Sequence, residues 1–277
     1  MKTVKALINK VVFFVAVVAT FTLTGCDEST SPSNINLFST SDEVALGQQI
    51  DSEIVANTNE YPILKNSQAT AYLQNIVNTI LNSPEIKYKN TFTYQVKIIN
   101  TNTINAFAVP GGYVYVYKGL IKFLDNEATM AAVLAHEIAH IERRHSTKRL
   151  TKQYGITILL SLVLGSNPGA LEEIAANLLT GLALLKNSRD DEYEADEYSF
   201  KYLLSTNWYP GGTKLFFEKI GANEQGGKLE ELLSTHPLPQ ERIKKVDNLL
   251  IKHGIGQPTE SNLYTQRYLS FKNSIQD

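Results

Sequence analysis

The stretch His136-Glu137-Ile138-Ala139-His140 decides how this sequence is interpreted. Two histidines four positions apart lie on one face of a helix, so both imidazoles can point at one metal ion. Glu137 lies next to that face, where its carboxylate can take a proton from a water molecule. This pattern is typical of zinc sites that hydrolyse peptide bonds. We therefore predict a single Zn²⁺ held by His136 and His140, with Glu137 as the general base.

The residues around the motif indicate a buried helix, although a chance match on an ordinary helix is the alternative. Asp125 or Asn126 can cap the helix, which we expect to continue to about Leu150. Two histidines and a glutamate in a buried helix need partners, because unpaired buried polar groups are costly. A metal ion supplies such a partner. Apolar side chains cover most of the helix, namely Ala131, Ala132, Val133, Leu134, Ala135, Ile138, Ala139 and Ile141.

A catalytic zinc ion usually has three protein ligands, and the third must come from another segment. The acidic stretch from Ser188 to Asp196 is the best candidate. Glu192 and Asp196 are four positions apart and share a helix face, whereas Glu194 points away from both. One of the two could bind zinc while the other accepts an imidazole N–H. The residues alone leave open the alternative of a solvated acidic helix start.

The rest of the chain predicts an α+β domain that is mainly helical. Three extended segments, 92–98, 104–109 and 113–117, alternate or are rich in β-branched and aromatic residues, and a Pro-Gly-Gly turn separates the last two. We expect them to form a small antiparallel sheet. Helices are predicted over 41–54, 68–81, 125–150, 156–164, 171–186, 190–204, 213–221, 228–234 and 239–252.

The N-terminus has the layout of a secretory signal. The first ten residues carry three lysines, an apolar run follows over 11–23, and Leu23-Thr24-Gly25-Cys26 ends it. That ending resembles a bacterial lipobox, which predicts cleavage before Cys26 and lipid attachment to it. A plain signal peptide or a short retained anchor helix is the alternative. Residues 26–40 are rich in Ser, Thr, Asn and Pro and are predicted to form a flexible tether.

Composition narrows the classes of protein that remain. The chain has 277 residues, 43% hydrophobic and 19% charged, with a net charge of −2, which suits one sizeable folded domain or two small ones. Cys26 is the only cysteine, so an internal disulfide is excluded. Lysine and arginine are scattered rather than gathered in a stripe, so we expect no nucleic-acid partner. The sequence does not indicate an oligomeric state.

The motif at His136, followed some fifty residues later by Ser-Arg-x-x-Glu-x-x-Ala-Asp at 188–196, resembles peptidase family M48 over most of residues 41–250. The resemblance implies a zincin-like (gluzincin) metalloprotease fold. It also implies that Glu192 is the third zinc ligand and that Asp196 orients a ligand histidine. Arg189 is expected to support the site by pairing with a nearby carboxylate.

Two further segments resemble the soluble and lipoprotein members of that family. The first is the strand Asn105-Ala106-Phe107-Ala108, which the resemblance implies is an edge strand that pairs with substrate backbone. The second is Thr235-His236-Pro237-x-Pro239-x-x-Arg242, whose histidine is implied to be a removable fourth zinc ligand that holds the enzyme idle. A histidine at this point could also assist the transition state. His236 could instead simply precede a proline in a turn. His145 is predicted to be structural and His253 exposed.

These observations lead to one functional expectation and one alternative. We expect a zinc metalloendopeptidase, anchored by lipid on Cys26 and facing the periplasm, that cleaves misfolded or misassembled cell-envelope proteins. The alternative is a proteolytically idle chaperone or assembly factor with the same zinc fold, which the intact Glu137 disfavours. The expected organisation is a signal peptide at 1–25, a tether at 26–40, the protease domain at 41–252 and a tail at 253–277.

Overall fold

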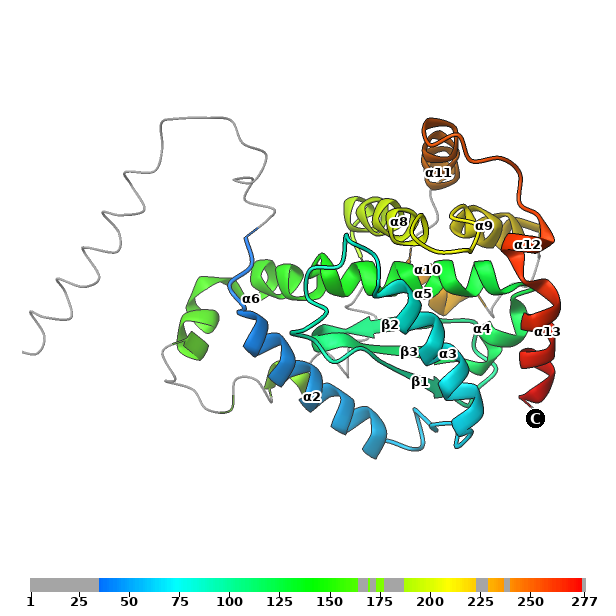
Figure 1. Ribbon diagram of the computed structural model, residues 1–277. Coiled ribbons are helices and arrows are strands. Elements are labelled where there is room, and N and C mark those ends of the chain that lie inside the picture. Colours follow the sequence, from blue (N-terminus) through cyan, green and yellow to red (C-terminus); the bar gives the residue numbers. More distant parts are fainter. Residues whose placement is uncertain are drawn as a thin grey trace, which may run out of the picture. The chain divides into compact units, whose positions relative to one another are not determined.

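A three-stranded sheet lies between two layers of helices (Figure 1). Strand β3 (Tyr113–Tyr117) is central, with β1 (Gln95–Ile99) on one side and β2 (Ala106–Val109) on the other. The computed structural model describes residues 35–163, 169, 173–176, 187–222, 229–236 and 240–275. The predicted signal peptide, Cys26, most of the tether and most of the predicted helix at 171–186 lie outside the described residues.

The sheet is mixed, so the prediction of an antiparallel sheet is wrong in one of its two pairings. β2 pairs with β3 antiparallel because the short 3₁₀ turn η3 (Pro110–Gly112) reverses the chain between them. Gly111 has a φ of 79°, and a Cβ there would lie 2.8 Å from the carbonyl oxygen of Glu43. β1 runs parallel to β3, because residues 100–105 cross the end of β3 before β2 begins.

The two faces of the sheet bury different side chains. The tyrosines of β3 and Phe107 of β2 pack with Leu46, Ile50 and Ile54 of helix α2 (Thr40–Ala56). Val114 and Val116 face the opposite way, into the larger core formed with α3 (Ser67–Ile80) and α5 (Glu127–Glu142). Because both faces are covered, all five residues of β3 are buried.

Helix α5 is the centre of the domain. Short α4 (Lys118–Phe123) precedes it, and α8 (Arg189–Leu203) and α9 (Gly212–Ala222) pack on the side away from the sheet (Figure 1). α11 (Gln240–Lys252) lies on α8 and α9, and α10 (Glu230–Thr235) is a single short helix. No helix among the described residues is both long enough and apolar enough to cross a membrane.

The motif helix ends earlier than predicted. α5 stops at Glu142, and α6 (His145–Val163) begins after a break instead of continuing the same helix through Leu150. Arg144 forms the break with a left-handed φ of 59°, and its Nε donates a 2.8 Å hydrogen bond to Glu43 Oε1. This tertiary contact with α2 holds a conformation that a non-glycine residue seldom adopts.

Both ends of the described chain pack onto the domain. Phe38, in the predicted tether, is buried beside α2. The predicted tail contains α12 (Glu260–Leu263) and α13 (Thr265–Ser274), which contact α3 and α5. Tyr268 of α13 is fully buried and donates to the carbonyl of Ile121 at 2.8 Å. The described residues from Asn36 onward thus belong to one compact unit.

Candidate active site

Helix α5 positions the two predicted zinc-binding histidines. The side chain of Asn126 caps it by accepting the Thr129 N–H at 2.9 Å, and Glu127 adds an acid in the first turn. Every residue of the helix is buried. His136 and His140 therefore project within the protein, where their Nε2 atoms lie 3.0 Å apart.

Helix α8 brings the predicted third ligand to the same place. Ser188 and Asp191 form a reciprocal capping box, with each side chain accepting the other residue's backbone N–H at 3.1 Å. Glu192 follows and is completely buried. Its Oε2 lies 3.4 Å from Nε2 of His136, and its Oε1 lies 3.3 Å from Nε2 of His140.

His236 completes a group of four buried side chains. It follows the last residue of α10, and its Nδ1 lies 3.0 Å from Oε1 of Glu192. One potential ligand atom from each of His136, His140, Glu192 and His236 lies within 4.8 Å of the others. The structure thus brings together all four residues for which the sequence suggested contact with zinc.

The Nδ1 atoms of His136 and His140 contact residues outside the group of four. Nδ1 of His136 lies 3.0 Å from Oδ1 of Asp196. Nδ1 of His140 lies 2.8 Å from Nδ1 of His145, whose Nε2 lies 2.8 Å from Oε2 of Glu194. A carboxylate only accepts, so His145 carries its proton on Nε2 and accepts at Nδ1 from the N–H of His140. Both Nε2 atoms of the metal-facing pair are then left as lone-pair donors.

These donors fit a zinc ion. Two nitrogen lone pairs and a carboxylate facing one another in a buried site need a cation between them, and imidazole and carboxylate are zinc's ordinary ligands. Burial lowers the pKa of His136, but its hydrogen bonds with Asp196 and Glu192 outweigh burial and raise that pKa to about 9. Burial raises the pKa of Glu192, but His236 and the α5 histidines hold it well below its ordinary value. The carboxylates thus favour positive charge at His136, whereas burial lowers the pKa of His140 well below its ordinary value and keeps that imidazole neutral.

Arg242 is a site residue for which the sequence assigned no role. Its Nε and Nη2 donate to the two oxygens of Asp196 at 2.6 and 2.7 Å, and its Nη1 lies 2.7 Å from Oε2 of Glu192. The prediction for Arg189 is wrong. Arg189 is exposed at the start of α8, since the first helical turn after the Ser188 cap faces solvent. The guanidinium that pairs with the carboxylates of the site comes from α11 instead.

His145 and Glu194 were also missed, for a geometric reason. On one continuous helix His145 would point away from His140. The break at Arg144 redirects the chain, so His145 packs against His140 without belonging to the group of four. His253 is exposed, as predicted, and its ring lies 5.3 Å from that of Phe200.

Glu137 stands between the group of four and the edge strand. Its Oε1 lies 3.5 Å from Nε2 of His236, and its carboxylate accepts a hydrogen bond from the backbone N–H of Ala108 in β2. Burial raises the pKa of Glu137, which favours proton uptake by this carboxylate.

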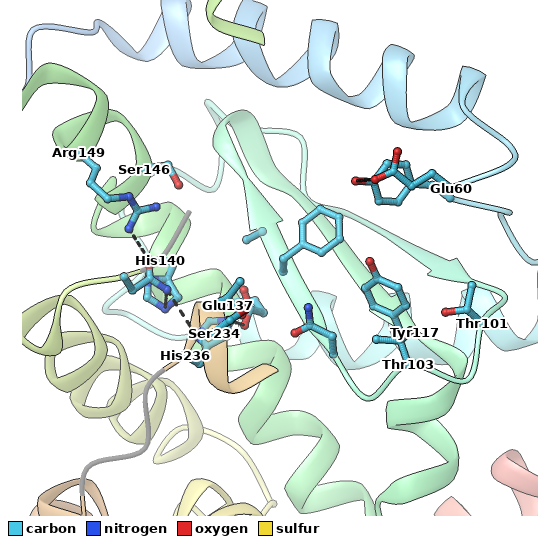
Figure 2. Close-up of a pocket in the computed structure, with 16 residues that line it drawn as sticks. Glu60, Thr101, Thr103, Tyr117, Glu137, His140, Ser146, Arg149, Ser234 and His236 are labelled. Carbon is cyan, nitrogen blue, oxygen red and sulfur yellow. Dashed lines mark hydrogen bonds and ion pairs between the residues drawn. The ribbon is translucent and has the colours of Figure 1, made fainter. Parts of the chain in front are cut away.

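A cavity of about 340 Å³ opens beside Glu137, His140 and His236 (Figure 2). One wall is formed by Phe107 and Ala108 of β2 and by Asn105, which directly precedes the strand. Neighbouring residues in β2 alternate in direction, and the Asn105 carbonyl accepts from the Tyr117 N–H. The main-chain groups of Ala106 and Ala108 therefore point away from β3, where the N–H of Ala106 donates to Oδ1 of Asn105 and the N–H of Ala108 donates to Glu137. This space suits an extended peptide next to the proton-accepting carboxylate.

A helix with two metal-facing histidines, a glutamate beside them and a third ligand from a following helix defines a metallopeptidase domain. The model of "Peptidase family M48" matches residues 67–250. The chain belongs to this family, whose members are zinc-dependent.

Three relatives illustrate the similarity. Mitochondrial metalloendopeptidase OMA1 of Schizosaccharomyces pombe is 29% identical over 75% of this chain and 61% of its own length. The beta-barrel assembly-enhancing protease of Yersinia pestis is 28% identical over 74% of this chain and 43% of its own length. OMA1 of Saccharomyces cerevisiae is 33% identical over 57% of this chain and 48% of its own length. The chain thus spans roughly half the length of these relatives.

Proposed function

We propose that this protein is a zinc metalloendopeptidase that hydrolyses peptide bonds in misfolded or misassembled proteins of the cell envelope. The observation that carries the proposal is Glu137, a buried carboxylate with a raised pKa, set between a zinc-binding group and a cavity bounded by an edge strand. Binding alone would not need a base at that point. Family membership and the metalloendopeptidase OMA1 relatives support the same reaction.

His136, His140 and Glu192 would hold the zinc ion, with His236 as a removable fourth ligand. When bound there, zinc acts as a Lewis acid that polarises a carbonyl and acidifies water. Glu137 takes the proton of the attacking water and delivers it to the nitrogen of the departing amine. Asp196 and His145 keep the two histidine rings in orientation, and Arg242 holds Asp196 and Glu192 in place. The outward main-chain carbonyls of Ala106 and Ala108 accept N–H groups of an extended substrate.

The decisive experiment measures zinc content and casein cleavage for the full-length chain in detergent, as wild type and as Glu137→Gln. We expect one zinc ion per chain in both and cleavage by the wild type alone, because glutamine keeps the shape of the side chain without its basicity. Removing a general base typically costs about 10²–10⁴-fold in rate. Absence of zinc from both proteins would refute the proposal, and equal cleavage by both would remove Glu137 from its role.

The envelope location is part of the same proposal. The lipobox-like ending at Cys26 supports lipid attachment, with the domain facing the periplasm. Relatives named beta-barrel assembly-enhancing proteases support envelope proteins as the substrate class. Cys26→Ser should move the protein from the detergent phase to the aqueous phase in a phase-separation assay. A wild type that already partitions into the aqueous phase would contradict lipid attachment.

An idle zinc-fold chaperone or assembly factor is the second candidate. His236 favours it, because this histidine lies against Glu192 and within 3.5 Å of Glu137 and so occupies space that a substrate carbonyl would need. The two candidates differ in what happens when His236 is removed. A gated protease gains activity, whereas a dedicated chaperone stays inactive while it continues to suppress aggregation of an unfolded client.

A further inference from the structure

The inference concerns the end of the active-site cavity formed by α6, and it rests on the proposed peptidase function. Arg149 lines this end, one helical turn after His145. Among the described residues that line the cavity, Arg149 is the one arginine or lysine. Glu60 lines the opposite side (Figure 2). Its two carboxylate oxygens accept from Tyr61 and Asn57, each at 3.0 Å. The guanidinium of Arg149 and the carboxylate of Glu60 thus lie on opposite sides of the cavity, and the Glu137 carboxylate is also part of its lining.

The charge of Arg149 is only weakly balanced by the protein. Its Nη1 donates to Oδ1 of Asn187, which is a neutral amide. Its ion pair with Asp191 is long, at 4.0 Å, and Asp191 is already engaged in the capping box of α8. Burial lowers the pKa of Arg149, and the attraction of Asp191 and Glu192 offsets only part of that effect. Arg242, by contrast, pairs directly with two carboxylates.

Asn187 determines which anion the guanidinium can reach. Its Nδ2 lies 3.2 Å from Nε2 of His140 and 3.5 Å from Nδ1 of His236, and its backbone N–H donates to the carbonyl of Thr235 at 3.2 Å. The amide thus stands between Arg149 and the metal-binding group. Arg149 cannot contact the reacting carbonyl while Asn187 is in this position. It can contact a side chain of the substrate that enters the cavity beside the scissile bond.

We propose that Arg149 forms an anion subsite that selects substrates with an aspartate or glutamate side chain close to the scissile bond. Its planar guanidinium matches a carboxylate with two parallel N–H donors, and helix α6 and Asn187 hold it in place. The subsite lies in a partly buried cavity, where charge-assisted hydrogen bonds are stronger than at an exposed surface. Arg149 thereby adds recognition of an acidic side chain to a peptidase whose edge strand contacts only the substrate main chain.

The test uses quenched fluorescent peptides of one sequence, in which glutamate or glutamine is placed at each of several positions around the scissile bond. At one position we expect the wild type to show about tenfold higher kcat/KM for glutamate than for glutamine. Arg149→Gln should bring this ratio to about one, and Arg149→Lys should retain part of it. Lys152→Gln removes a charge from the same helix at an exposed position outside the cavity, so it should keep the wild-type ratio.

A binding assay separates this proposal from the proposed reaction. Zinc-loaded Glu137→Gln should bind the glutamate peptide about tenfold more tightly than its glutamine counterpart, and adding Arg149→Gln should abolish the difference. If the wild type cleaves no peptide but this difference is present, the anion subsite stands and the peptidase proposal fails. The subsite is refuted if no position discriminates in either assay, or if the preference survives Arg149→Gln. Zinc content and melting temperature show that each variant is folded.

Discussion

At the scale of single residues, His236 lies where it could bind the proposed zinc ion in the place of a substrate. Its Nδ1 contacts Glu192, its Nε2 faces Glu137, and its ring lies 5.3 and 5.5 Å from those of His136 and His140. A histidine bound there blocks the position that an active zinc site leaves open. If His236 gates the site as proposed, these contacts set the fraction of molecules that is ready to bind substrate.

His236→Ala should increase casein cleavage. If nine in ten molecules hold the histidine in place, its removal raises the rate about tenfold, because the competent fraction rises from one tenth to nearly all. His253→Ala, at an exposed histidine, is the matched control and should leave the rate unchanged. A rate that stays the same would mean that His236 does not gate the site. A fall would mean that it assists the reaction.

His145 contacts His140, and we expect it to affect zinc binding through that contact. Its Nδ1 accepts a hydrogen bond from the N–H at His140 Nδ1, so the lone pair of His140 lies on Nε2, which faces the group of four. His145→Phe keeps an aromatic ring but offers no acceptor, so zinc affinity should fall about 10–100-fold. Competition with a chelator measures this, and His145→Gln should recover part of the affinity because its amide oxygen accepts a hydrogen bond. Equal affinities for wild type and His145→Phe would rule out this role.

At the scale of elements, Glu194 ties α8 to α5 and α6. It accepts from Arg143 Nε and His145 Nε2, each at 2.8 Å. Burial raises its pKa, but His145 and Arg143 outweigh burial and lower that pKa to about 2. Because the folded state binds this proton less readily than the unfolded state, the contribution to stability is present above pH 4.5 and is lost as the pH falls toward 2.

Glu194→Gln tests this link through the pH dependence of unfolding. At neutral pH the variant should be less stable by about 1–2 kcal/mol, a value reduced for the partial exposure of the side chain. The difference between wild type and variant should shrink as the pH is lowered from 5 to 3, as measured by urea denaturation at each pH. Glu197→Gln, on an exposed part of the same helix, is the control. A difference that is constant with pH would exclude an effect of ionisation.

The elements also show which features of the site could be predicted from the sequence. His136 and His140 follow a local spacing, and so do Glu192 and Asp196, so the sequence predicted both pairs. The break at Arg144 depends on a contact with Glu43, about one hundred residues away, and no local signal marks it. Arg242 ends the segment at 235–242 that resembles the family, but its contacts with Asp196 and Glu192 form only when α11 packs on α8. The helix break and the role of Arg242 were therefore missed because both depend on tertiary contacts.

At the scale of the whole molecule, the proposed zinc site joins three segments that are distant in the chain. His136 and His140 come from α5, Glu192 from α8 and His236 from the end of α10. Arg242 of α11 braces Glu192 and Asp196 from behind. The unfolded chain cannot hold these ligands together, so zinc binds mainly the folded state and adds its binding free energy to the stability of the domain.

Removal of zinc should therefore destabilise the whole domain. With free zinc at about a thousand times its dissociation constant, the loss is about 4 kcal/mol, which for a domain of this size lowers the melting temperature by roughly 8–16 °C. Calorimetry with and without a chelator measures the change. Glu137→Gln should show the same fall, because Glu137 is not among the proposed ligands, and His140→Ala should respond little because it has lost one. The wild type could instead melt at the same temperature with and without chelator. In that case the group of four does not hold a metal ion that stabilises the fold, and the proposed zinc-dependent reaction is not supported.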